Sequence, residues 1–172
     1  MKKATAPIII VFAALLCFSA CSNDSTENTT NRQGTSLTVG SEIIASQLMD
    51  YSEMLGRSEK DLIAQKGEGE IRVDSKENVA SRCYEENVLG FLGSVYYIFS
   101  EKDGDLIVKE VMVVFRGVTF NDAVTGISQQ LGDAASVEHK ETSADAYWNS
   151  FHCQYHLAKY ENALMLSVKK DS

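Results

Sequence analysis

Two strand-like runs flank an Asp-Gly pair in the middle of the chain, where residues 91–115 read FLGSVYYIFSEKDGDLIVKEVMVVF. β-branched and aromatic residues fill both runs, as is typical of strands. The pair Asp103-Gly104 suits a two-residue hairpin turn, which needs positive φ at both central positions. The sequence therefore predicts an antiparallel hairpin with strands over residues 91–99 and 106–115.

A second hairpin is predicted near the carboxyl end. Residues 147–157 alternate between a mainly apolar set and a more polar set, the period of two that a half-buried strand shows. The apolar set is Tyr147, Phe151, Cys153, Tyr155 and Leu157, and the other set holds Trp148, Ser150, His152, Gln154 and His156. After a turn at residues 159–162, Leu164, Leu166 and Val168 give the partner strand its apolar side.

A short helix signal precedes each hairpin. Ser58 is followed three residues later by Asp61, which predicts a helix start with a capping box, and Gly67 closes that helix. The same signal recurs from Thr119, where Val124, Ile127 and Leu131 form an apolar stripe before Gly132. An additional helix in front is expected to begin with Ser41 as its cap and to bury Ile44, Leu48, Tyr51 and Leu55.

These signals predict an α+β fold in which short helices pack on one face of an antiparallel sheet. The order of helix and meander occurs twice, over about residues 55–116 and 117–172, within a single domain of residues 37–172. The alternative is a cystatin-like or nuclear-transport-factor-like cone, in which one long helix crosses a curved sheet and encloses a ligand pocket. A helix at residues 120–131 separates the two, because only the repeat contains it.

The amino-terminal residues have the organisation of an export signal. Lys2 and Lys3 precede an apolar run over residues 8–18, which is too short for a membrane span of about 20 residues. Residues 18–21, Phe-Ser-Ala-Cys, resemble the bacterial lipobox, which implies cleavage of a signal peptide of residues 1–20 and lipidation of Cys21. Ser22, rather than Asp, follows the cysteine; by resemblance to bacterial sorting rules this favours the outer membrane, where the source has one.

Composition describes the rest of the mature chain. Residues 21–36 are almost entirely small and polar, as expected of a flexible tether. The formal net charge of −8 argues against a nucleic-acid partner, which would require clustered Lys and Arg. We expect the protein to contact the membrane through the lipid on Cys21.

Cysteine and histidine residues are the first candidates for chemistry. In an exported protein, Cys83 and Cys153 either pair as a disulfide or remain two separate buried thiols, and the sequence leaves both open. On one strand, Cys153 points away from His152 and His156, so we expect no metal site there. Neighbouring residues Glu85 and Glu86 face apart on an extended chain, which disfavours an acid/base pair. No catalytic motif and no cofactor motif is found, so we expect a protein that is not an enzyme.

Residues 55–63, followed by Lys66-Gly67, resemble the opening of β-lactamase-inhibitor-protein-like (BLIP-like) domains, and residues 119–132 resemble its second copy. The resemblance implies a short helix pair before a four-stranded antiparallel sheet, and a function in binding other proteins. It also implies that the sheet face away from the helices meets the partner, with Trp148, His152 and His156 as candidate residues. For Trp148 the alternative is that a bulge turns its side chain into the core. The expected function is a membrane-anchored, non-enzymatic protein-binding module at the cell envelope; the alternative is small-ligand binding by the cone.

Overall fold

The computed structural model describes residues 40–76 and 78–171, with side chains described from Gln47 onward in those ranges. The predicted signal peptide, Cys21 and the tether of residues 21–36 lie outside the described residues.

Three helices and one eight-stranded antiparallel sheet make up the described chain, in an α+β fold. The elements are α1 (Gly40–Met54), α2 (Glu59–Lys66), β1 (Glu70–Val73), β2 (Val79–Val88), β3 (Phe91–Lys102), β4 (Asp105–Phe115), α3 (Phe120–Leu131), β5 (Ser136–His139), β6 (Ser143–Ser150), β7 (Cys153–Tyr160) and β8 (Ala163–Lys170).

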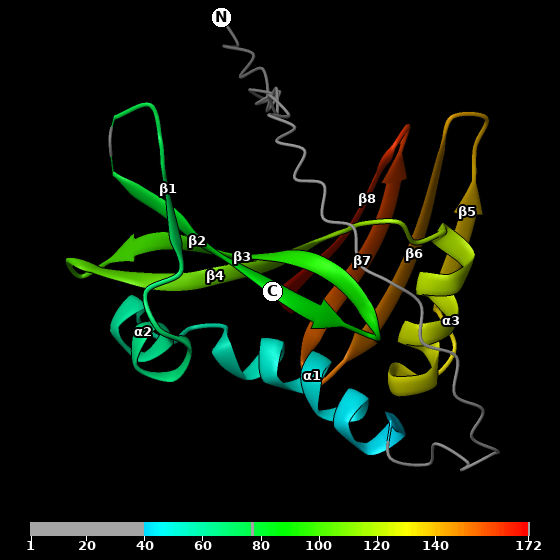
Figure 1. Cartoon of the computed structure of the whole chain (residues 1–172), viewed down its shortest axis with the longest axis horizontal. Helices are drawn as coiled ribbons and strands as arrows, with labels where there is room; N and C mark the ends of the chain where they lie inside the picture. Colours follow the sequence, from blue (N-terminus) through cyan, green and yellow to red (C-terminus); the bar gives the residue numbers. More distant parts are fainter. Residues whose placement is uncertain (1–39, 77, 172) are drawn as a thin grey trace, which may run out of the picture. The chain divides into compact units, whose positions relative to one another are not determined.

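A helix followed by a four-stranded meander occurs twice, first as α2 with β1 to β4 and then as α3 with β5 to β8 (Figure 1). The strand order is β1-β2-β3-β4-β8-β7-β6-β5, so the last strand of each meander joins the two into one sheet. Strands β4 and β8 pair antiparallel from Val111 opposite Val168 to Phe115 opposite Leu164. The predicted fold class and tandem repeat are confirmed.

The two repeats open with the same local chemistry. Ser58 caps α2, with its hydroxyl accepting from the Asp61 backbone N–H and the Asp61 carboxylate accepting from the Ser58 backbone N–H. Thr119 caps α3 in a similar way, with its hydroxyl accepting from the Asp122 backbone N–H. Both helices end at a glycine of positive φ, 83° at Gly67 and 84° at Gly132, a conformation that glycine adopts without a Cβ clash.

At the helices, one detail differs from the sequence predictions and another decides between two of them. Helix α1 already includes Gly40, so Ser41 lies inside the helix and is not its cap. Helix α3 occupies residues 120–131, the segment that the cone would leave without a helix. The fold is therefore the repeat rather than the cone.

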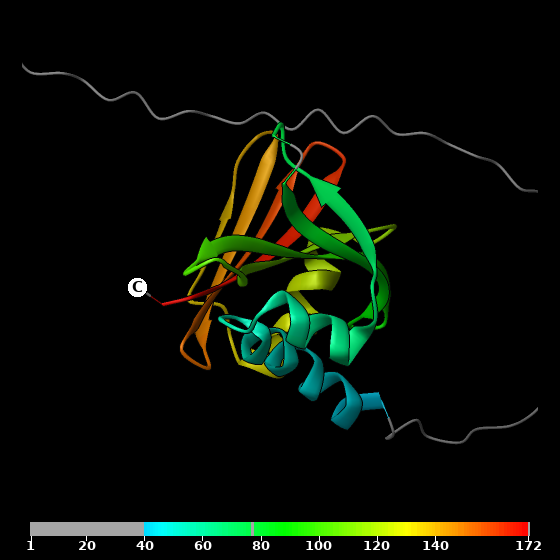
Figure 2. The ribbon, with the colours of Figure 1, turned by 90° about the vertical axis from the view of Figure 1, so that its left-hand side faces the viewer.

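All three helices contact the same face of the sheet, and the strand register shows why. One row of residues crosses six adjacent strands on this face, namely Arg82, Tyr97, Val111, Val168, Tyr155 and Trp148. Every member of the row is buried, and side chains of α1, α2 and α3 reach members of it. The helices accordingly gather on one side of the strands in both ribbon views (Figures 1 and 2).

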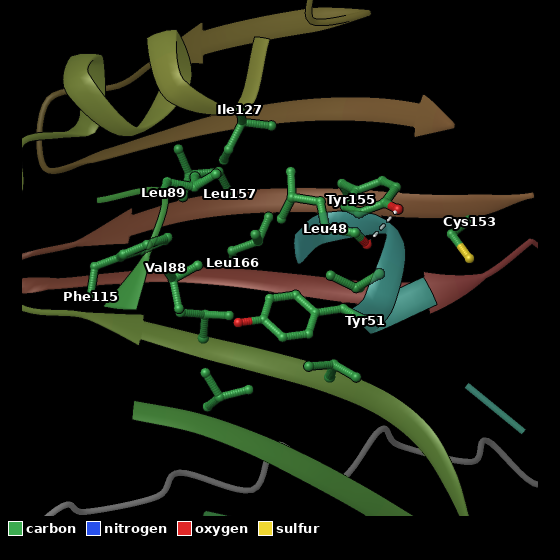
Figure 3. Close-up of a cluster of buried hydrophobic side chains, with 14 of the residues drawn as sticks. Leu48, Tyr51, Val88, Leu89, Phe115, Ile127, Cys153, Tyr155, Leu157 and Leu166 are labelled. Atoms are coloured by element: carbon green, nitrogen blue, oxygen red, sulfur yellow. Dashed lines mark hydrogen bonds between the residues drawn. The ribbon is translucent and has the colours of Figure 1, made fainter. Parts of the chain in front are cut away.

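The core lies between this row and the helices. Helix α1 inserts Leu48 and Tyr51 into a cluster of buried side chains that includes Tyr155 and Leu166 of the sheet and Ile127 of α3 (Figure 3). The Tyr155 hydroxyl donates to the Leu48 carbonyl at 3.3 Å, which satisfies a buried polar group at the helix contact. Full burial of such side chains contributes roughly 1.5–3 kcal/mol each, so the apolar core is the main source of stability.

The predicted single strand over residues 147–157 is wrong, because it is two strands joined by a two-residue turn. Phe151 and His152 form that turn with φ of 53° and 57°. Since the turn pairs Ser150 with Cys153 and Trp148 with Tyr155, Trp148 shares a face with Tyr155 instead of with His156. Trp148 is 2% exposed, and its indole N–H lies within hydrogen-bond distance of Ser128 Oγ and the Gly132 carbonyl. Trp148 therefore lies in the core, as the alternative prediction had it, although a hairpin turn and not a bulge places it there, and its predicted partner-binding role is corrected.

We expect Trp148→Ala to lower the free energy of unfolding by about 3–5 kcal/mol, because it empties a buried site in a packed core. The matched substitution Tyr147→Ala, at the neighbouring residue on the other face, should cost about 1 kcal/mol or less. Urea unfolding followed by circular dichroism measures both. Equal losses for the two variants would show that the assignment of faces is wrong.

Candidate binding face

The side of the sheet opposite the helices, here called the open face, is free of helices in the described chain. Another row of aligned residues crosses it, one position offset from the buried row: Cys83, Tyr96, Met112, Ser167, His156 and Tyr147. Most members of this row are half-buried or exposed, in contrast to the row beneath the helices. The open face is thus a helix-free surface that the strands of both repeats share.

An apolar strip occupies the centre of the open face. Tyr96 lies opposite Met112, and Val114 lies opposite Met165, so the strip crosses β3, β4 and β8, with Ser94 and Ser167 as its small polar neighbours. Ile98 extends it along β3, and all five side chains are half-buried. Leu92 and Tyr160 on the same face are more exposed, at 53% and 50%. Contiguous exposed apolar side chains of this kind are typical of a protein interaction site.

Carboxylates beside the strip are neutralised by their own neighbours. Glu85 accepts from Ser94 Oγ at 2.7 Å and from Arg116 Nη2 at 2.9 Å. Glu110 accepts from Ser167 Oγ at 2.7 Å, and Lys169 Nζ lies 3.3 Å from its second oxygen. Because each charge has a partner, a protein that covers the strip need not leave these carboxylates unpaired.

A third carboxylate holds His156 in place. Asp145 Oδ1 lies 2.9 Å from His156 Nε2, and the His156 ring stacks on Tyr147 with centroids 4.3 Å apart and planes 4° apart. The Asp145 side chain is only 9% exposed, so the interaction orients the imidazole from below. This arrangement presents a rigid aromatic pair at the end of the strip where β6 and β7 lie.

The predicted candidate set is only partly brought together. His156 lies on the open face, His152 is in the exposed turn at the end of β6, and Trp148 lies on the opposite, buried face. The strip residues Tyr96, Met112 and Met165 were missed. Their signal is the period of two within each strand, which places them on the side opposite the buried valines, leucines and tyrosines.

Glu85 and Glu86 face opposite sides of β2, as predicted. Glu86 points to the helices, where it accepts from the Tyr51 hydroxyl at 3.1 Å and pairs with Lys66 Nζ at 2.8 Å. Burial raises the pKa of Tyr51 and of neighbouring Tyr97, so both phenols stay protonated at neutral pH. This cluster fastens α1 and α2 to β2, and we assign it a structural role.

The two cysteines of the domain are free and buried, which agrees with the alternative of two separate thiols and corrects the disulfide between Cys83 and Cys153. Cys83 is in β2 and Cys153 is in β7, with β3, β4 and β8 between them in the sheet. Adjacent strands are about 4.8 Å apart, whereas a disulfide requires Cα atoms within about 7 Å. Burial raises the pKa of both thiols.

Other kinds of site find little support in the part of the chain that the structure describes. Within residues 40–76 and 78–171, no three His, Cys, Asp or Glu side chains are arranged to hold a metal ion. An open hollow of about 400 Å³ lies at the turn between β5 and β6, lined mostly by that turn and the end of β7. None of the helices among these residues is both long and apolar enough to cross a bilayer.

Comparison with known proteins gives no relative: no family model matches the chain, nor does any curated protein or solved structure.

We expect Cys83 and Cys153 to resist a thiol reagent at pH 8 in the folded mature protein, because both are buried and burial raises the pKa of each thiol. Both should react once guanidinium unfolds the chain, without any reductant. A colorimetric thiol assay before and after unfolding measures this. Thiols that appear only after reduction would instead indicate a disulfide.

Proposed function

We propose that this protein is a lipoprotein of the bacterial cell envelope that binds another protein through its open face and performs no catalysis. Cys21 carries the lipid, residues 21–36 act as the tether, and the α+β domain is the binding module. We also propose that the domain is BLIP-like, as its sequence resemblance implies. The order of one helix followed by a four-stranded meander, which occurs twice, supports this proposal.

The observation that carries the binding role is the apolar strip of Tyr96, Ile98, Met112, Val114 and Met165. Helices shield the other face of the same strands, so nothing in the fold requires this face to be apolar. Tyr and Met are enriched in the buried centres of protein interfaces. Glu85 and Arg116, both about half exposed and paired with each other, would form part of the polar rim.

The strip also defines the kind of partner that we propose. The carboxylates beside the strip are compensated locally, although the chain as a whole carries a formal net charge of −8. Binding would then depend mainly on apolar contact and shape, and only weakly on salt. The Tyr147 and His156 pair supplies a flat aromatic surface at one end, suited to stacking against a side chain of the partner.

Substitution of Met112 tests the binding face. A photo-crosslinking amino acid at Tyr96, in the full-length protein in its own membranes, should give a specific adduct. Met112→Glu should reduce that adduct by about tenfold or more, because it buries a charge in the centre of the interface.

Met49→Glu is the matched control, because Met49 is an exposed methionine on α1, which packs on the opposite face. It should leave the adduct unchanged. Thermal unfolding of both variants confirms that each is folded. If both variants reduce the adduct equally, or neither does, the open face is not the binding site.

Replacement of the lipidated cysteine tests the anchor. Cys21→Ser should abolish acylation, and with it the hydrophobic contribution of about 0.8 kcal/mol per buried CH₂ that retains the protein at a bilayer. Fractionation in high salt should then release the variant while the wild type stays with the membrane. Retention of a variant that is processed at the same bond would refute lipid anchoring and leave the binding face untouched.

A further inference from the structure

Strand β1 forms one edge of the sheet, and no described strand pairs with its outer side. All four of its residues are exposed, including Ile71 at 48% and Val73 at 57%. An edge strand with unpaired backbone groups and apolar side chains is a template for a further strand. The edge therefore has the chemistry to extend the sheet.

The sequence of β1 is complementary to itself in the antiparallel direction. If a twofold axis passes between the two copies of Ile71, Glu70 of each copy lies opposite Arg72 of the other, which gives two equivalent opposed pairs. Ile71 then lies opposite Ile71 of the second copy. The faces also agree, because Glu70 and Arg72 lie on the open-face side of β1, opposite Cys83 and Ser81, whereas Ile71 lies on the helix side.

Within one chain these charges are already close, since Arg72 Nη2 lies 3.0 Å from Glu70 Oε1. Both side chains are more than half exposed, at 53% and 62%, so each can turn toward a second copy without losing a buried contact. Cross-strand opposite charges and cross-strand apolar pairs each stabilise a sheet. In the dimer, the two intrachain ion pairs, one in each copy, are exchanged for two cross-strand pairs, and the added Ile-Ile contact and the backbone hydrogen bonds of the new strand pair favour pairing.

We propose that two copies of this chain pair through β1 as an antiparallel, twofold-symmetric dimer with Ile71 at its centre. The two eight-stranded sheets then form one continuous sheet. This inference concerns self-association and holds whether or not the open face binds another protein.

The other edge of the sheet fits a second copy less well. Self-pairing of β5 (Ser136–His139) about Val137 places Glu138 opposite Ser136, without a matching charge. Pairing of β1 with β5 of another copy does match charges, with Arg72 opposite Glu138. The resulting assembly has a free sheet edge at each end, however, so further copies would add to it without limit. Most homo-oligomers instead close about a twofold axis.

The symmetry has a further consequence that rests on the proposed lipid anchor. A twofold axis between two antiparallel strands of one sheet is perpendicular to that sheet, so both copies direct their helices to the same side. Helix α1, which follows the tether, lies on that side in both copies. Both tethers could then reach one membrane, and the two open faces would lie side by side.

Disulfide crosslinking in the full-length protein in its own membranes tests the dimer. Opposite residues of an antiparallel pair have Cα atoms about 4.5–5.5 Å apart, within disulfide range. Ile71→Cys should therefore form a disulfide-linked dimer under mild oxidation, about tenfold above the same substitution at Val137 on the β5 edge. The native Cys83 and Cys153 are buried and give no background.

Charge variants in the Ile71→Cys background separate this register from the others. Arg72→Glu should abolish the crosslink, and adding Glu70→Arg should restore it, because the two opposed pairs re-form with exchanged signs. Failure to restore would overturn the register. A Val137→Cys dimer, a ladder of higher bands from Val73→Cys combined with Val137→Cys, or no crosslink from Ile71→Cys would each overturn the β1 dimer.

Discussion

The packing of all three helices against one buried row of side chains is the constraint on which the rest of the structure depends. Tyr97, Val111, Val168, Tyr155 and Trp148 carry this row across five strands, from the first repeat into the second. Side chains alternate along every strand, so a row that faces the helices commits the next position of each strand to the opposite face. The open face, with Tyr96 and Met112, is thus a direct consequence of how the core is packed.

Local signals made a large part of this fold predictable. The Asp103-Gly104 turn, the caps at Ser58 and Thr119, and the closing glycines act over a few residues and need no tertiary information. The turn at Phe151 and His152 gave little signal, because it lacks glycine, asparagine and aspartate, and Phe rarely adopts positive φ, although His does so more often than most residues. The hairpin there reversed the predicted face of Trp148, and the edge strands β1 and β5 were too short and polar to stand out.

The candidate binding face was less predictable than the fold, because long-range pairing assembles it. Val114 and Met165 lie opposite each other across the junction of β4 and β8, although they are far apart in the chain. Alternation within a strand shows which residues share a side, but it does not show which strands are adjacent. Of the three residues predicted from the sequence for the binding face, His156 is the one whose side chain lies on the open face, where it contacts Asp145.

The junction of β4 and β8 has a consequence for how the chain acquires its structure. Each meander closes through contacts between successive strands, which form quickly, whereas Val111 must wait for Val168 near the end of the chain. The slow step in folding should therefore be the docking of two preformed halves. Until the last strand arrives, the inner edge of β4 is unpaired, and a nascent or truncated chain at that stage is prone to aggregate. A chaperone would have its greatest effect on this half-assembled state.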